Sequence, residues 1–129
     1  MGYKHSELTR AIINAFYQVY NTLGYGFLEK VYENALIHEL RKRGYKVIQQ
    51  SSIEVYYDGV IIGEYYADLL VNGSVILELK SVESISKQHE AQLINYLKAS
   101  NIDVGLVLNF GPKPEVRRKI YETARKTSK

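Results

Sequence analysis

Three consecutive strand-like segments constrain the fold of this 129-residue chain more than any other feature. Residues 46–57, 60–71 and 74–81 are rich in β-branched and aromatic side chains, which are typical of strands. The dipeptides Asp58-Gly59 and Asn72-Gly73 separate the segments, and both favour tight hairpin turns. The sequence therefore predicts an antiparallel meander of three strands in the middle of the chain.

Helical patterns stand on both sides of the predicted meander. Apolar residues recur at helical spacing over residues 8–23 and 28–43, with a Gly-Tyr-Gly break between them. A third helix is expected over residues 86–99, and an apolar strand over residues 102–110. Pro114 suits the first turn of a final helix that reaches about residue 125.

The resulting element order, ααβββαβα, predicts an α/β fold. The helix before the fourth strand is a crossover, which would place this strand parallel to the third strand with the usual right-handed sense. We therefore expect a four-stranded mixed sheet flanked by helices on both faces. The length suits a single domain that spans residues 1–129.

Composition narrows the classes of protein that the chain can belong to. Its 46% hydrophobic and 24% charged content is typical of soluble globular proteins. The absence of cysteine excludes disulfides, zinc–thiolate sites and a cysteine nucleophile, and it fits a cytoplasmic location. No apolar run approaches the ~18 residues that span a membrane, so no membrane association is expected.

Asp68, Glu78 and Lys80 lie within the second and third predicted strands. Residues two apart on a strand point to the same face, so Glu78 and Lys80 share one face. Burying an acid and a lysine in a central strand costs free energy unless both find partners. Either the two residues form an ion pair on an exposed edge strand, or Asp68 joins them in a metal site.

The length of the loop at Asn72-Gly73 decides between these interpretations. A two-residue loop would place Asp68 and Glu78 on opposite faces of the sheet, whereas a three-residue loop or a bulge would bring them together. The apolar pattern of the two strands supports the second register, because only that register puts these residues on one face: Leu69, Val71, Val75, Leu77 and Leu79. We therefore predict an odd-length loop or a bulge near Asn72-Gly73.

Acids and a lysine on one face suit the cleavage of a phosphodiester. The reaction needs charge neutralisation at the phosphate and an activated water, and Mg²⁺ or Mn²⁺ held by carboxylates supplies both. Asp68 and Glu78 are the expected direct metal ligands, and the backbone carbonyl of Leu79 is a third. Lys80 would orient the attacking water and offset developing charge. These residues predict a metal-dependent nuclease.

Polar residues of the predicted helices are further candidates, each with a less specific alternative. Glu29 and Glu33 lie four apart on one helix face, and either could reach the metal through water or remain a solvated acid. Gln92 could hold a water or the phosphate, or lie on the surface. His89 could act as an acid–base group or serve a surface role.

Two sets of residues could contact nucleic acid. Residues 113–129 carry seven Lys/Arg and two acids, a net charge of +5, and Arg117, Arg118 and Lys119 lie in the predicted final helix. These cations could bind phosphates or form a solvated charged end. The Tyr-Tyr pairs at residues 56–57 and 65–66 could stack on bases or pack within the sheet.

Taken in order, these segments resemble the GxxExxY family within the PD-(D/E)xK nuclease superfamily. The resemblance extends from about residue 8 to residue 120. The matching segments are GFLEKVY (26–32), YYADLLV (65–71), VILELK (75–80), HEAQLINYL (89–97) and VGLVLNFG (104–111). The superfamily's proline before the first strand acid is absent, because Ala67 stands there.

The resemblance implies a restriction-endonuclease-like core and divalent-metal chemistry on DNA. It selects Glu29 over Glu33 as the helix acid, and it makes Gln92 a member of the site. A chain of this size would need a homodimer or a larger partner protein to grip a duplex. The alternative is a non-catalytic module with the same fold that binds nucleic acid or a protein.

Overall fold

The computed structural model describes residues 4–122, and in this part of the chain three helices and five strands form. No helix among them is long and apolar enough to cross a membrane. In chain order the elements are α1 (Ser6–Leu23), α2 (Glu29–Lys42), β1 (Val47–Tyr57), β2 (Val60–Val71), β3 (Val75–Lys80), α3 (Lys87–Ala99), β4 (Val104–Phe110) and β5 (Pro114–Ile120).

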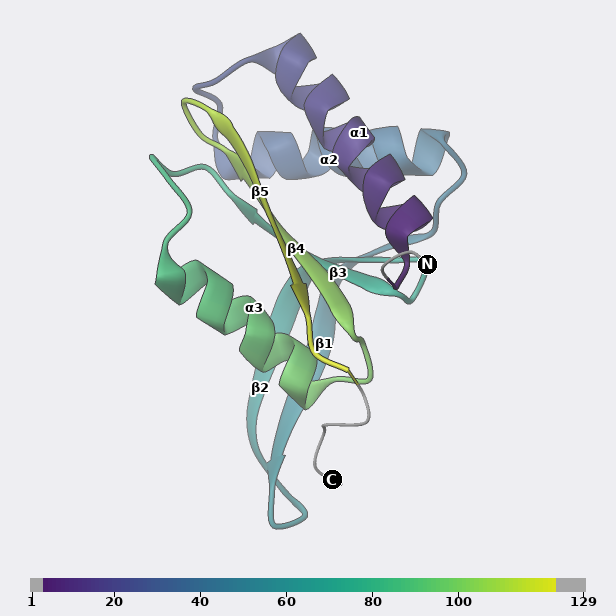
Figure 1. The fold of residues 1–129 in the computed structure, drawn as a ribbon, viewed down its shortest axis with the longest axis vertical. Coiled ribbons are helices and arrows are strands. Elements are labelled where there is room, and N and C mark those ends of the chain that lie inside the picture. Colours follow the sequence, from purple (N-terminus) through teal and green to yellow (C-terminus); the bar gives the residue numbers. More distant parts are fainter. Residues whose placement is uncertain (1–3, 123–129) are drawn as a thin grey trace.

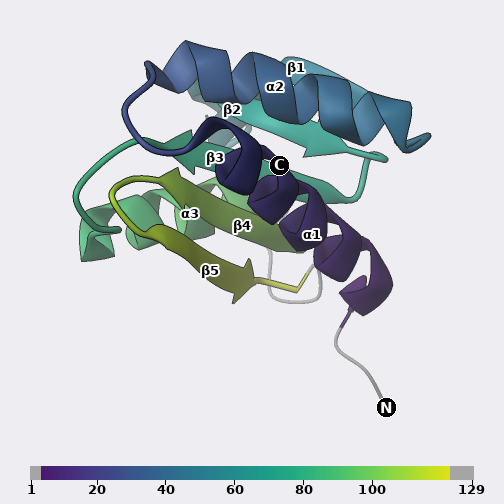
Figure 2. The same ribbon diagram turned by 90° about the horizontal axis from the view of Figure 1, so that it is seen from above.

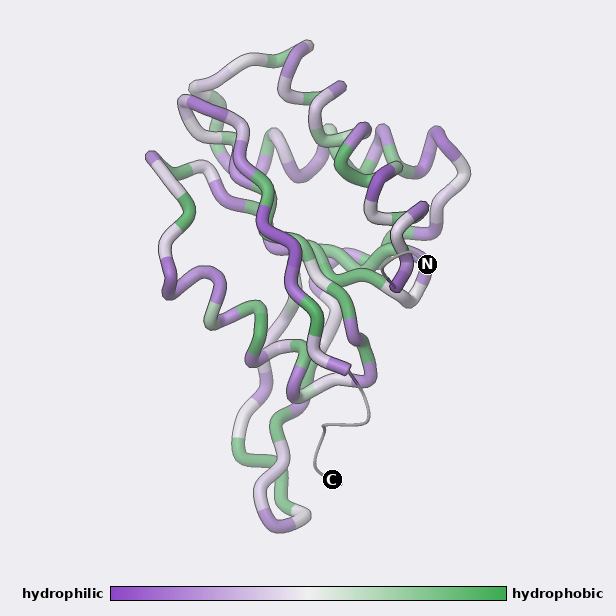
Figure 3. Tube along the Cα trace, viewed as in Figure 1, coloured by the Kyte–Doolittle hydropathy of each residue, from purple (hydrophilic) through white to green (hydrophobic). Residues whose placement is uncertain are grey.

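The strands form one mixed sheet in the order β1-β2-β3-β4-β5, which confirms the predicted α/β class. Neighbouring strands are antiparallel except for β3 and β4, which are parallel and joined by α3. The β1–β2 hairpin projects well beyond the rest of the sheet (Figure 1). The central strands are the most hydrophobic part of the trace, and apolar segments also occur along the hairpin (Figure 3).

Helices cover both faces of the sheet, as predicted. Figure 2 shows α1 and α2 on one face and α3 on the other. The α1–α2 side buries the larger apolar cluster, in which Phe16, Tyr32 and Phe110 are fully buried. The α3 side buries a smaller cluster around Ile76, Leu93 and Leu97. Both faces of the central strands are therefore shielded from water, and polar residues on them stand out.

The predicted final helix is wrong, because Pro114–Ile120 is a fifth strand paired antiparallel with β4. Val116 and Ile120 pack against the larger cluster, so the apolar residues of this segment repeat every four residues on one strand face. This spacing is compatible with a strand as well as with a helix. Pairing with β4 decides the outcome, because it also satisfies the backbone groups along the edge of that buried strand.

The loop between β2 and β3 confirms the predicted register. Val71 pairs with Val75 and Leu69 with Leu77, so three residues, 72–74, form the loop. Asn72 and Gly73 both adopt positive φ, at 52° and 62°, which these two residue types tolerate best. The odd loop length places the positions of Asp68 and Glu78 opposite each other.

The loop between β3 and α3 is tied to the sheet by a fully buried side chain, Asn109 of β4. Its Oδ1 accepts a hydrogen bond from Val82 N at 3.0 Å, and its Nδ2 donates to Val82 O at 3.0 Å and to Glu115 Oε1 at 2.9 Å. Glu115 also accepts from Ile85 N. Asn109 thus fixes the chain directly after Lys80 and before α3.

This close packing predicts that Gly111→Ala destabilises the protein. A Cβ at Gly111 would lie 2.0 Å from the carbonyl oxygen of Val82, which belongs to the backbone and cannot rotate away. We expect the free energy of unfolding to fall by about 1–3 kcal/mol, measured by urea denaturation. Gly63→Ala is the matched control, because its Cβ would meet only the Tyr65 ring, at 3.7 Å. Equal stability of the two variants would contradict the proposed packing.

Candidate functional site

Asp68 and Glu78 exchange hydrogen bonds with each other's strands where the paired region of β2 and β3 ends. The backbone N–H of Asp68 donates to Glu78 Oε2 at 2.9 Å, and the N–H of Leu79 donates to Asp68 Oδ2 at 2.8 Å. The last regular pair before them is Leu69 with Leu77. The two carboxylates therefore take the place of backbone acceptors and are held beside each other by the sheet.

One oxygen of each carboxylate remains available. Within residues 4–122, Asp68 Oδ1 and Glu78 Oε1 accept no hydrogen bond, and no unpartnered side-chain oxygen there is fully buried. In an extended strand the N–H and C=O of a residue point to the same side, so the Leu79 carbonyl faces β2 like its N–H. Two carboxylate oxygens and one carbonyl oxygen therefore lie at the end of the β2–β3 pairing.

These oxygen donors fit a hard divalent cation. Mg²⁺ is commonly held by one or two carboxylates and completes its shell with water and phosphate. The described part of the chain contains no group of three or more His, Cys, Asp or Glu side chains already arranged to hold a metal. The structure therefore offers a two-carboxylate site with a backbone carbonyl, and it lacks a closed cage of side chains.

Burial and nearby negative charge raise the pKa of both carboxyls. Glu78 is only 6% exposed, and burial, together with the charge of Asp68, raises its pKa to about 8. Burial also raises the pKa of Asp68, and Glu33 adds to the shift. The Leu79 N–H and the Lys80 charge act in the opposite direction on Asp68. At neutral pH the metal-free pair therefore holds a proton, mainly on Glu78.

Lys80 and Glu29 belong to the same electrostatic neighbourhood. The charge of Lys80 lowers the pKa of Asp68, Glu78 and Glu29. Glu29 is the first residue of α2. Desolvation by the surrounding protein raises its pKa, and the charge of Asp68 raises it further. Within the described residues Lys80 forms no close ion pair with an acid. The structure therefore gathers four of the predicted residues around one location.

Tyr32 explains how the chain places Glu29. Its ring is fully buried and stacks on Phe110 of β4, with centroids 4.5 Å apart. Its hydroxyl donates to Gly24 O and accepts from Phe27 N at 3.1 Å. The loop before α2 is thus anchored to the sheet, and Gly26 adopts a φ of 120° within it. In the segment 26–32, the glycine permits the turn and the tyrosine fixes it, so Glu29 begins the helix beside the strand acids.

Glu33 occupies a different position from Glu29. It is 6% exposed, and its Oε2 accepts from Gln49 Nε2 at 2.6 Å and lies 3.4 Å from Lys30 Nζ. Its carboxylate is therefore engaged by neighbours, although its charge raises the pKa of Asp68. The sequence contains no signal for Gln49, since a single glutamine on a strand has many roles.

The residues of α3 contribute less directly than expected. Gln92 is exposed and donates to the Tyr96 hydroxyl, so the structure does not bring it into contact with the acids. Tyr96 is buried, and after burial its pKa is raised by Glu78 and Asp68, which places it near the pair. The sequence signal that could have identified Tyr96 is its position four residues after Gln92, on the same helix face. Ser86 is the N-cap of α3 and His89 completes the capping box: the His89 Nδ1 accepts from Ser86 N, and the His89 backbone N–H donates to Ser86 Oγ.

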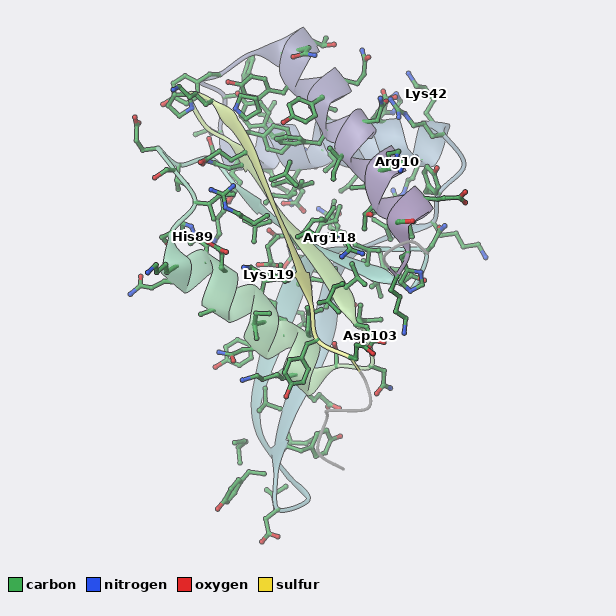
Figure 4. The ribbon with its side chains drawn as sticks, in the orientation of Figure 1. Arg10, Lys42, His89, Asp103, Arg118 and Lys119 are labelled. Atoms are coloured by element: carbon green, nitrogen blue, oxygen red, sulfur yellow. The ribbon has the colours of Figure 1, made fainter. Side chains whose placement is uncertain are left out.

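The predicted cluster of three cations is divided between the two faces of β5. Lys119 and Arg117 pair with Glu90 of α3, and Arg117 also lies 3.7 Å from Glu115. Arg118 points to the other side, where it donates to the carbonyl of Lys4 (Figure 4). The basic helix predicted from the sequence is therefore wrong. Successive side chains of a strand point to opposite faces, whereas a helix would have placed the three cations close together.

The raised pKa of Glu78 predicts that the metal-free protein loses stability as the pH rises. Between pH 4.5 and about 8 the folded state keeps a proton that the unfolded state has released, so the free energy of unfolding falls through this window. Glu78→Gln removes the titration. We expect its Tm in EDTA to exceed that of the wild type by a few degrees at pH 8 and to match it near pH 4.

Calorimetry across this pH range tests the prediction. Glu64→Gln is the control, because Glu64 is an exposed acid on the same strand as Asp68, and it should retain the wild-type pH dependence. A constant difference in Tm between Glu78→Gln and the wild type at every pH would contradict the assignment.

Comparison with known proteins assigns the chain to a family. The sequence profile of the PD-(D/E)XK nuclease superfamily matches residues 6–119. No curated protein matches the chain. Among solved structures, the crystal structure of SSO0001 is similar, with a TM-score of 0.55 and 19% identity over 92% of this chain and 59% of that one. The chain thus spans about three fifths of the length of SSO0001.

A second similar structure is Archaeoglobus fulgidus Hjc, a Holliday junction resolvase from an archaeal hyperthermophile. It matches with a TM-score of 0.42 and 21% identity over 69% of this chain and 72% of that one. The likeness to SSO0001 concerns the fold, which is the restriction-endonuclease-like α/β core expected from the sequence. Since the family profile extends over most of its length, the chain belongs to the PD-(D/E)XK nuclease superfamily.

Proposed function

We propose that this protein is a metal-dependent phosphodiesterase that cleaves DNA, and that it belongs to the GxxExxY group of the superfamily. The observation that carries the proposal is a pair of hydrogen bonds, from Asp68 N–H to the Glu78 carboxylate and from Leu79 N–H to the Asp68 carboxylate, which leaves one oxygen of each acid available. The location of Tyr32, which anchors the loop before Glu29, gives the GxxExxY motif a physical role.

Asp68, Glu78 and the Leu79 carbonyl would hold Mg²⁺ or Mn²⁺, with Glu29 reaching it through water. When bound, the cation supplies charge neutralisation at the phosphate and lowers the pKa of a water molecule. Lys80, beside both acids, would orient the attacking water and stabilise charge that develops on the phosphate. Gln92, which donates to the Tyr96 hydroxyl, would support the substrate from α3.

The proton on Glu78 couples cation binding to pH. Since its pKa is about 8 in the metal-free protein, a cation must displace that proton to use the carboxylate. Binding therefore becomes more favourable as the pH rises toward 8. The buried location that makes the carboxylate basic also makes it a strong ligand once it is ionised.

We further propose that residues 1–129 act as one nuclease-like domain, and that a homodimer or a larger partner protein completes the grip on the substrate. The pairing of Arg117 and Lys119 with Glu90 supports this view, because it limits the contribution of these cations to DNA binding. The absence of cysteine supports a cytoplasmic location.

Cleavage assays test the proposed chemistry. We expect the wild type to cut DNA in Mg²⁺ or Mn²⁺ and to lose activity in EDTA. Asp68→Asn and Lys80→Met should lower the cleavage rate about 100-fold or more, because each removes a charge that acts on the phosphate or the cation. The assay should use labelled duplex, single-stranded and branched DNA, so that each structural form of the substrate is tested.

Matched variants separate these effects from general loss of charge. Glu64→Gln and Lys87→Met change exposed residues outside the site and should cleave like the wild type. Absence of metal-dependent cleavage on every substrate would overturn the proposal. Binding to nucleic acid without turnover would instead favour the non-catalytic module.

A second prediction separates the roles of Glu29 and Glu33. Glu29→Gln should lower the cleavage rate without lowering the Tm, because this acid is exposed at the helix start and its charge is repelled by Asp68. Glu33→Gln should lower the free energy of unfolding by about 1–3 kcal/mol, because it weakens the contacts of this buried acid with Gln49 and Lys30. If Glu33→Gln lowers the cleavage rate and Glu29→Gln lowers the free energy of unfolding, the selection of Glu29 is contradicted.

A further inference from the structure

A groove of about 750 Å³ lies between α3 and the β1–β2 hairpin, beside the acid site. Three tyrosines line it: Tyr56 of β1, Tyr65 of β2 and Tyr96 of α3. Its volume is within the range of clefts that hold small ligands or parts of larger ones. The proposed metal ligands do not line this groove, so the groove is a separate feature of the surface.

Its aromatic surface is partly open. The rings of Tyr65 and Tyr96 lie 5.8 Å apart at an angle of 39°, and Tyr96 is buried beneath while Tyr65 is 51% exposed. The Tyr56 hydroxyl donates to Glu54, which restricts the orientation of that ring. A ring that is backed by a second ring and open on its other side suits stacking by a flat ligand.

Amide groups stand opposite these rings. Gln88, Gln92 and Asn95 line the groove from α3, and all three lie on neighbouring turns of the helix. Amide side chains donate and accept hydrogen bonds, so they can bind base edges as well as phosphate or sugar oxygens. Lys98 is the one charged residue among those that line the groove, and no carboxylate does so. The lining therefore suits a ligand that combines flat rings with negative charge.

The groove lies close to the acid site. Gln92 and Tyr96 line it, and the pKa of Tyr96 is raised in part by Glu78 and Asp68. Tyr65 precedes Asp68 by three residues on β2, a separation of roughly 10 Å along an extended strand. One or two nucleotides cover such a distance, so a strand that lies in the groove would present a phosphate to the acids.

We propose that this groove binds unpaired nucleotides of the DNA strand next to the phosphate that is cleaved. The inference rests on the proposed function and adds the substrate class: DNA with a single-stranded segment, such as an overhang, a flap or a gap. Bases within a duplex are stacked on each other and cannot lie on Tyr65, whereas unpaired bases stack on exposed aromatic rings regardless of sequence.

The test measures binding without cleavage. Fluorescence anisotropy in EDTA compares a blunt duplex with a duplex that carries a single-stranded overhang of several nucleotides. We expect the wild type to bind the overhang substrate about tenfold more tightly, and Tyr65→Ala to remove this preference, since stacking on one base contributes a factor of this size. Asn95→Ala, at an exposed helix position, should weaken it as well. Thermal denaturation verifies that each variant is folded.

Tyr57→Ala is the matched control, because Tyr57 lies on the same hairpin, is 73% exposed and does not line the groove. It should keep the wild-type preference. An overhang that carries 5-iodouracil should cross-link on irradiation to a peptide containing Tyr56, Tyr65 or Tyr96. Equal affinity for both substrates, or cross-links confined to other peptides, would overturn the inference.

The outcomes also separate this inference from the proposed nuclease activity. If the wild type cleaves blunt DNA and Tyr65→Ala binds the overhang substrate as the wild type does, the groove assignment is wrong and the nuclease proposal still stands. Overhang preference without any cleavage would retain the groove and remove the enzyme. Dimerisation of the wild type that is lost in Tyr65→Ala, measured by sedimentation, would show that a second copy fills the groove and would overturn the inference.

Discussion

The rest of the site depends on two hydrogen bonds between β2 and β3, which the carboxylates of Asp68 and Glu78 accept from backbone N–H groups. The N–H groups of Asp68 and Leu79 need acceptors where the pairing of β2 and β3 ends, and the two carboxylates supply them at 2.9 and 2.8 Å. The sheet therefore holds both acids directly through its own backbone. Because only one oxygen of each is used in this way, the other remains available to a ligand.

This arrangement concentrates charge in a partly dehydrated location. Glu29 and Glu33 of α2 add to the negative charge of the strand acids, and Lys80 opposes it. The raised pKa of Glu78 is the consequence, since a buried carboxyl beside another carboxylate is costly to ionise. Such a cluster destabilises the metal-free protein, and a divalent cation would relieve the repulsion. The large pKa shift of Glu78 therefore lies where ligand chemistry is proposed.

Buried anchors connect this location to the rest of the fold. Tyr32 stacks on Phe110 and fixes the loop before Glu29, while Asn109 fixes the loop after Lys80. Both anchors act on β4, the strand whose residues are all buried. The helix acid, the lysine and the start of α3 are therefore positioned from the same strand. The groove beside α3 shares this support, because the loop held by Asn109 leads directly into that helix.

The sequence by itself determined the order of the first seven elements, the register of β2 and β3, and the grouping of Asp68, Glu78 and Lys80. These follow from side-chain alternation and turn residues, which act over a few neighbouring positions. Pro114–Ile120 became a strand because pairing with the buried edge of β4 outweighed its local pattern. The different surroundings of Glu29 and Glu33, the proximity of Tyr96 to the acids, and the division of the β5 cations were likewise decided by tertiary structure. Each depends on contacts between segments far apart in the chain, which short-range periodicity does not encode.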